Sequence, residues 1–194
     1  MPLPRRPRSR AGFTLIELTV VVVIMGLIAG IAIVSWKAMV PNQQLNTALR
    51  NLSEVLYGTR SDAIARSHEF RIYYDIDGST TSPEQADTYY VRMPFTPDGE
   101  IALSDEQEHT CVHQTDLKKA GIDIVQVTVD DVTYTDGVVF VRFDPLGAAS
   151  HHTVLLRQAL FEREFTIEAL PLTGEIRVHE GAFEREPALE NDFK

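Results

Sequence analysis

Cysteine is almost absent from this chain of 194 residues, in which Cys111 is the single one. A lone cysteine cannot form an intrachain disulfide, so the fold does not rest on disulfides even in an oxidising compartment. We expect Cys111 to be a small buried hydrophobic residue rather than an intermolecular bridge. Catalytic motifs are also lacking: there is no Gly-x-Ser-x-Gly, no phosphate-binding loop and no His-Glu-x-x-His helix. The sequence therefore does not predict an enzyme.

Basic side chains are scarce as well, with 18 Lys and Arg against 28 Asp and Glu. Four of the arginines lie within residues 1–12, which contain no acid, so loss of that segment would lower the formal charge from −10 to −14. An acidic surface repels phosphate backbones, and this disfavours nucleic-acid binding. The strongly acidic stretch 180–194 predicts a flexible C-terminal tail.

Charge is missing altogether from the nineteen residues Leu18 to Trp36. As a helix they would span roughly 28 Å, close to the hydrocarbon thickness of about 30 Å. Glu17 stands directly before them, although an ionised acid costs roughly 2.5–3.5 kcal/mol at the centre of a membrane helix and less near its end. The helix dipole offsets only about 0.3–1 kcal/mol of that cost. Glu17 therefore needs a positive partner.

An uncleaved membrane anchor would explain the N-terminal arginines and the apolar run. The positive-inside rule would keep those arginines in the cytoplasm and place the rest of the chain across the membrane. Such an anchor leaves Glu17 unexplained.

The segment Gly12-Phe13-Thr14-Leu15-Ile16-Glu17 resembles the class III signal sequence of type IV pilins and type II secretion pseudopilins. The resemblance implies cleavage between Gly12 and Phe13 by a prepilin peptidase, N-methylation of the new Phe13 amine, and assembly into a helical filament. It also makes Glu17 an assembly contact that pairs with the Phe13 amine of its own or a neighbouring subunit. On this hypothesis, Glu17→Ala or Glu17→Val inserts normally into the membrane but assembles poorly.

The helical pattern continues beyond the apolar run. Spacings of four and three residues predict an amphipathic stripe that packs on a core, formed by Leu45, Leu49, Leu52, Leu56, Thr59 and Ala63. We therefore expect one long helix over roughly residues 13–66, half in the membrane and half on a globular domain.

From Phe70 onward, runs of β-branched and aromatic residues between Gly-containing turns predict strands. The expected strands are Phe70–Ile76, Thr88–Met93, Ile122–Val129, Val138–Phe143, Thr153–Leu160, Phe165–Leu170 and Glu175–Val178. The polar stretches 77–88 and 104–121 are expected to be loops. The predicted fold is α+β, a long N-terminal helix packed on an antiparallel sheet. Its predicted parts are a leader at 1–12, a transmembrane and assembly helix at 13–40, a periplasmic domain at 41–179 and the tail at 180–194.

Residues in the C-terminal half make the resemblance more specific, because they point to one subgroup of these proteins. The segment Phe143-Asp144-Pro145-Leu146-Gly147, two following strands and the Leu172-Thr173-Gly174 turn are similar to the ending of H-type minor pseudopilins and related minor type IV pilins. The resemblance implies a single-pass protein of the bacterial inner membrane that joins a periplasmic pseudopilus and supports export of folded proteins. Its implied partners are the prepilin peptidase and other pseudopilins, with the secretin or a secreted substrate as further candidates.

Two other classes of function stay open. One is a minor type IV pilin that serves pilus assembly, adhesion or DNA uptake, which a clustered Lys/Arg face on the domain would favour. The other is a membrane-anchored enzyme or receptor with an unrelated periplasmic domain, which a catalytic cleft would favour.

Three groups of residues invite a metal-site interpretation. His109, Cys111 and His113 would lie on one face of a strand, but no further pair of ligands accompanies them, and we interpret them as a mixed surface segment. His151-His152 is expected to begin a strand. Asp75-Ile76-Asp77-Gly78 begins like a calcium loop, but Thr80 and Ala86 replace the expected Gly and Glu, so a turn is predicted. We predict no metal and no cofactor.

Overall fold

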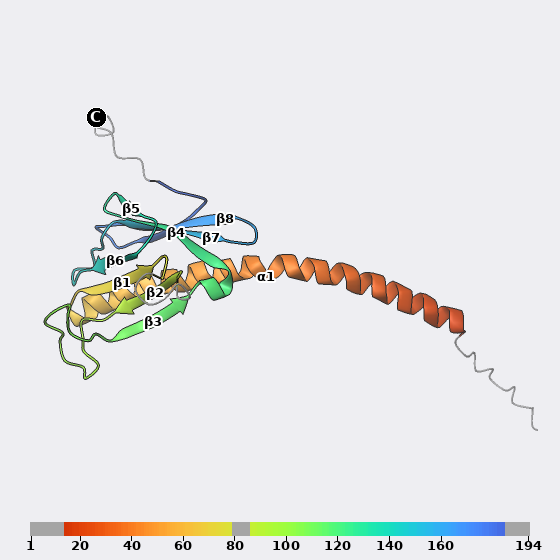
Figure 1. Cartoon of the computed structure of the whole chain (residues 1–194), viewed down its shortest axis with the longest axis horizontal. Helices are drawn as coiled ribbons and strands as arrows, with labels where there is room; N and C mark the ends of the chain where they lie inside the picture. The colour runs from red at the N-terminus through yellow and green to blue at the C-terminus, as the bar shows by residue number, and fades with distance from the viewer. Residues whose placement is uncertain (1–13, 79–85, 185–194) are drawn as a thin grey trace, which may run out of the picture. The chain divides into compact units, whose positions relative to one another are not determined.

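The computed structural model describes residues 14–78 and 86–184, with the side chains of residues 31–42 outside that description. Within this range, the helix α1 (Leu15–Arg66) is followed by β-strands that form two antiparallel sheets (Figure 1). The chain divides into two compact units, Met1–Val40 and Pro41–Lys194.

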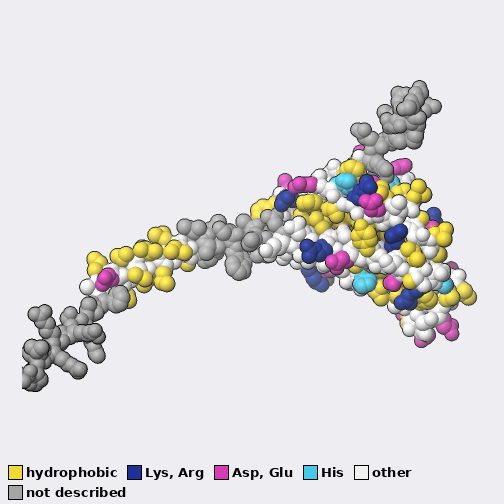
Figure 2. All heavy atoms as spheres, turned by 180° about the vertical axis from the view of Figure 1, so that it is seen from behind, with side chains coloured by type: hydrophobic (Ala, Val, Ile, Leu, Met, Phe, Trp, Pro, Cys, Tyr) yellow, Lys and Arg dark blue, Asp and Glu magenta, His cyan; other side chains and the backbone are white. Residues whose placement is uncertain are grey.

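In the first unit, the described part of α1 is apolar and exposed. Large hydrophobic side chains are exposed at almost every position from Leu15 to Ile28. Figure 2 shows this stretch as a nearly continuous hydrophobic surface with an acidic side chain at its N-terminal end, where Glu17 is the acid of the first turn. No helical stretch among the described residues is both long enough and apolar enough to cross a membrane.

In the second unit, α1 contributes the predicted stripe to the core. All six positions of that stripe are buried, with exposed fractions from 0% at Leu52 to 6% at Leu49. The spacing of four and three residues puts these side chains on one face, so the prediction of a long helix with an amphipathic half is confirmed.

Two sheets complete the domain. The four-stranded sheet has the order β3 (Cys111–Asp116), β2 (Thr88–Arg92), β1 (Phe70–Asp75), β6 (Val138–Phe143). The five-stranded sheet has the order β5 (Val132–Tyr134), β4 (Ile122–Val129), β7 (His152–Gln158), β8 (Arg163–Ala169), β9 (Ile176–Glu180). The α+β fold with antiparallel sheets is therefore confirmed.

Alternation along the strands separates a core face from an outer face. On β1, Phe70, Ile72 and Tyr74 are buried, while Arg71 and Tyr73 between them are only half-buried. Because successive side chains of a strand point to opposite faces, Arg71 and Tyr73 belong to the outer face of the four-stranded sheet.

Two expectations about the stretch 104–121 need correction. The stretch 104–121, expected to be a loop, contains β3 and a short 3₁₀ helix at Lys118–Ala120. The sequence showed no strand there because β3 is a polar edge strand with little burial. Cys111, expected to be buried, is exposed at the start of that edge strand.

The first residues of the predicted tail contact the five-stranded sheet. Strand β9 extends to Glu180, and the backbone N–H of Phe183 donates a 3.0 Å hydrogen bond to Thr166 Oγ1 on β8. The ring of Phe183 also stacks on His179, with centroids 3.7 Å apart. Residues 180–184 are thus attached to the sheet, and the rest of the predicted tail, 185–194, lies outside the described residues.

Candidate functional site

The best candidate site is the beginning of α1, where a capping box holds Glu17. The carbonyl oxygen of Thr14 accepts the first helical hydrogen bond, from the backbone N–H of Leu18 at 3.3 Å. Thr14 Oγ1 accepts a hydrogen bond from the Glu17 backbone N–H at 3.3 Å, and Glu17 Oε2 accepts one from the Thr14 backbone N–H at 3.1 Å. These are the two reciprocal bonds of a Thr-x-x-Glu capping box.

Only one of the two oxygens of the Glu17 carboxylate is hydrogen-bonded to the described residues. Oε2 also accepts a hydrogen bond from the Thr14 hydroxyl at 3.0 Å, whereas Oε1 has no partner among the residues described. A capped carboxylate is held in place by its neighbours, and its second oxygen stays open to a positive group. The capping role of Thr14 was not predicted, although the spacing Thr14-x-x-Glu17 is typical of a capping box.

The other two predicted site residues cannot be placed in the same way. Gly12 and Phe13 lie outside the described residues, so cleavage between them and methylation of Phe13 remain predictions.

The predicted histidine and cysteine group does not share one strand face. His109 precedes β3, and its ring nitrogens lie 2.9 Å from Met93 O and 3.2 Å from Ser104 O. His113 has a positive φ of 55°, which breaks the alternation within β3. The segment is a polar sheet edge.

His151 and His152 have different surroundings at the start of β7. His152 is fully buried, and burial lowers the pKa of its imidazole to about 4. The His151 Nε2 atom lies 3.6 Å from Glu168 Oε1, and His179 Nε2 lies 3.0 Å from Glu168 Oε2. Glu168 itself is only 2% exposed, so this trio is a buried polar contact between strands β7, β8 and β9.

The structure gives no support to a metal site. Over residues 14–78 and 86–184, no three His, Cys, Asp or Glu side chains are arranged to hold a metal ion. At the predicted calcium-like turn, Asp75 Oδ1 instead accepts a hydrogen bond from the Gly78 backbone N–H at 2.7 Å.

The C-terminal motif around Phe143 forms a tight turn that contacts α1. Asp144 Oδ1 accepts hydrogen bonds from the backbone N–H groups of Leu146 and Ala148 at 2.8 and 2.9 Å. Gly147 has a positive φ of 87° in this turn, and Phe143 is fully buried beside it. The motif therefore has a structural role in closing the domain.

Comparison with known proteins identifies the N-terminal region. Residues 7–33 match the family model described as the prokaryotic N-terminal methylation motif. The match shows that the N-terminal region, which includes Gly12, Phe13 and Glu17, is similar to this motif. No curated protein matches the chain in sequence.

One solved structure is similar over most of the chain. It is the minor pseudopilin EpsH from the Type 2 Secretion System of Vibrio cholerae, with 13% sequence identity and a TM-score of 0.45. The similarity covers 70% of this chain and 95% of that one.

Proposed function

We propose that this chain is a minor pseudopilin of a type II secretion system. In this role it is cleaved after Gly12, methylated at Phe13 and anchored in the inner membrane by its apolar helix, with the globular domain in the periplasm. It then joins a short filament that supports export of folded proteins. The observation that carries the proposal is the position of Glu17, capped through one oxygen at the start of an exposed apolar helix within the methylation motif.

The physical argument concerns charge. The hydrogen bonds from Thr14 lower the cost of placing the Glu17 carboxylate at the start of an apolar helix, but they do not neutralise its charge. An amine at Phe13, created by cleavage, would neutralise that charge when subunits pack together. Assembly with other subunits would therefore stabilise the helix in the membrane.

Two substitutions separate capping from charge. Gln at position 17 can still accept the hydrogen bond from Thr14, because a capping box tolerates Glu or Gln, whereas Ala cannot. The full-length chain, carrying Glu17→Gln or Glu17→Ala, is co-expressed with a prepilin peptidase and the other filament proteins. Mass spectrometry of the N-terminus measures cleavage and methylation, and crosslinking in membranes measures assembly.

If charge pairing drives assembly, Glu17→Gln assembles as poorly as Glu17→Ala while both are cleaved normally. If Glu17→Gln assembles like the unmodified chain, Glu17 acts only as a helix cap and the assembly proposal fails. An N-terminus that stays uncleaved in the presence of the peptidase also contradicts the proposal.

The alternative is a minor type IV pilin. Deletion of the gene in its own host separates the two functions, because loss of a secreted folded enzyme with intact pili supports the pseudopilin. Loss of piliation or of DNA uptake with normal secretion supports the pilin.

A further inference from the structure

The outer face of the four-stranded sheet carries a row of arginines across three strands. The strand register pairs Arg71 on β1 with Arg92 on β2 and with Arg142 on β6. Like charges directly opposite each other destabilise a sheet, so this row is a cost to folding. The guanidinium of Arg142 is exposed and has no hydrogen-bond or ion-pair partner among the residues described. Because the chain as a whole is acidic, with a formal charge of −10, we expect a row of three arginines that destabilises the sheet to serve a function.

A row of aromatic side chains lies next to these arginines, formed by Tyr90, Tyr73 and Phe140. The rings of Tyr73 and Tyr90 stack with centroids 5.3 Å apart and planes at 4°. The Arg71 guanidinium lies 5.1 Å from the centre of the Phe140 ring, and Arg92 lies 5.8 Å from that of Tyr73. These contacts hold the guanidinium groups in place, which lowers the entropy lost when a ligand binds them.

The chain itself shows what this row recognises. Arg71 Nη1 donates hydrogen bonds to both carboxylate oxygens of Asp105, at 2.9 and 3.1 Å. Arg92 Nη2 donates another to the backbone oxygen of Asp105 at 2.7 Å. Arg71 Nε also donates a hydrogen bond to Glu69 Oε1 at 2.7 Å. The side chains of Asp105 and Glu69 are 67% and 37% exposed, and ion pairs in such positions are weak, so another carboxylate can compete with them.

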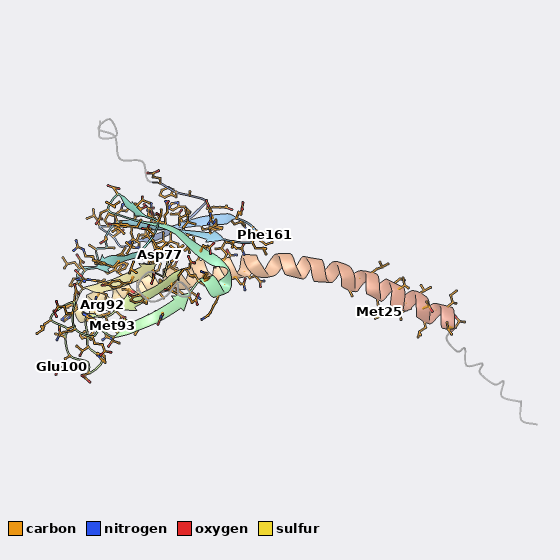
Figure 3. All side chains as sticks on the ribbon, in the orientation of Figure 1. Met25, Asp77, Arg92, Met93, Glu100 and Phe161 are labelled. Atoms are coloured by element: carbon orange, nitrogen blue, oxygen red, sulfur yellow. The ribbon has the colours of Figure 1, made fainter. Side chains whose placement is uncertain are left out.

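The row connects two hollows in the surface. Arg71, Arg92 and Asp105 are among the residues that line a hollow of about 420 Å³ beneath the loop between β2 and β3. Figure 3 labels Arg92, at the end of the domain where this loop, which includes Glu100, projects. Phe140 and Arg142 line a second hollow of about 390 Å³. A bound segment could extend from one to the other over the arginines.

We propose that the row Arg92–Arg71–Arg142 is a docking surface for an acidic segment of another protein, with Asp105 and Glu69 as competitors from the chain itself. The ligand it fits is an extended segment that presents carboxylates to the three guanidinium groups. Arginine and tyrosine are also the residues that most often dominate binding at protein interfaces. This docking surface goes beyond the proposed function. It is also a clustered arginine face of the kind that DNA uptake by a minor type IV pilin would need, so a nucleic acid is the competing ligand.

A nucleic acid fits the same surface less well. Binding of single strands relies on aromatic faces that are free to stack on bases. Here Tyr73 and Tyr90 stack on each other and Arg71 lies over Phe140. The acidic chain also repels a polyanion over longer distances.

The test measures binding of two labelled probes of equal charge to the full-length chain in detergent at low salt. One probe is an octaglutamate peptide with blocked ends, and the other is a nine-nucleotide oligothymidylate. Arg142→Gln, at a position without partners, keeps the fold and is expected to weaken octaglutamate binding about twofold to fivefold. Asp105→Asn is expected to strengthen it, because one competing carboxylate is gone. Arg177→Gln, on the exposed edge strand β9, removes an arginine that pairs with Glu175 away from the row, and as the control it should leave binding unchanged.

The results decide between the partners. Tighter binding of octaglutamate, weakened by Arg142→Gln and unaffected by Arg177→Gln, supports the proposal. Tighter binding of oligothymidylate with the same loss in Arg142→Gln overturns it in favour of a nucleic acid. Absence of octaglutamate binding, or equal loss in Arg142→Gln and Arg177→Gln, overturns it as well.

Discussion

Arg60 Nε on α1 donates a 2.9 Å hydrogen bond to the backbone oxygen of Gly147, in the turn that follows β6. Gly174, in the turn before β9, lies against the same side chain. A Cβ atom added at Gly174 would lie only 2.5 Å from Arg60 Cδ. Two turns that are distant in sequence therefore meet around one arginine. Both glycines have positive φ, 87° at Gly147 and 59° at Gly174.

Gly174→Ala is expected to destabilise the domain by about 1–3 kcal/mol, because the new methyl group meets Arg60 and the backbone takes a conformation that disfavours alanine. Gly121→Ala is the control, since Gly121 has a similar φ of 69° but nothing within 4 Å of the added atom. Denaturant midpoints of the full-length variants measure both effects. Equal losses would show that backbone strain alone matters and that the contact with Arg60 does not.

Acid is expected to destabilise the domain through His152. Burial lowers the pKa of His152 to about 4 in the fold, against 6.5 when it is unfolded. Folding therefore favours the neutral imidazole of His152. The contribution of this group to the stability of the domain is fully present above pH 6.5 and is lost as the pH falls toward 4. The expected loss is on the order of 3 kcal/mol. His152→Gln should flatten the stability curve in this range, whereas His113→Asn, at an exposed histidine, should not.

Glu168 is expected to hold strands β7, β8 and β9 together. Glu168→Leu removes the contacts with His151 and His179 and should cost about 1–3 kcal/mol in unfolding free energy, because buried polar partners are left behind. Glu168→Gln should cost less, since an amide still bonds to a histidine ring. Thermal unfolding compares the two, with Glu164→Gln on the same strand as control. An equal loss in both Glu168 variants would mean that the negative charge, rather than hydrogen bonding, is what stabilises the contact.

Cys111 is expected to react with a maleimide in the folded protein, because its side chain is exposed on β3. Partial desolvation raises the pKa of this thiol, so the rate should rise steeply with pH above neutrality. Mass spectrometry of the undenatured full-length chain follows the modification. Labelling only after addition of denaturant would restore the original expectation of a buried cysteine.

Much of the fold could be predicted from local pattern. Strands β4 and β6 were predicted with the bounds that the structure shows, because each is rich in β-branched residues and lies between turn residues. Strand β3 was missed since its residues, Cys-Val-His-Gln-Thr-Asp, are polar and their pairing depends on β2 rather than on their own composition. Strand β5 was missed because three exposed residues carry too little pattern.

The two candidate sites also differ in how far they could be predicted from local sequence. Glu17 could be predicted because a single acid before an uncharged run is visible in the sequence. The arginine row could not, since Arg71, Arg92 and Arg142 lie far apart along the chain and become neighbours only through strand register. Local chemistry is legible in a sequence, whereas a surface built by pairing of strands is not.

The cap at the start of α1 uses atoms of Thr14 and Glu17 only. A cut after Gly12 would therefore remove none of them, and a single residue would separate the new terminus from the capped turn. The precursor and the processed chain would share the same helix terminus. Maturation would then change the charge next to the helix without any refolding of it.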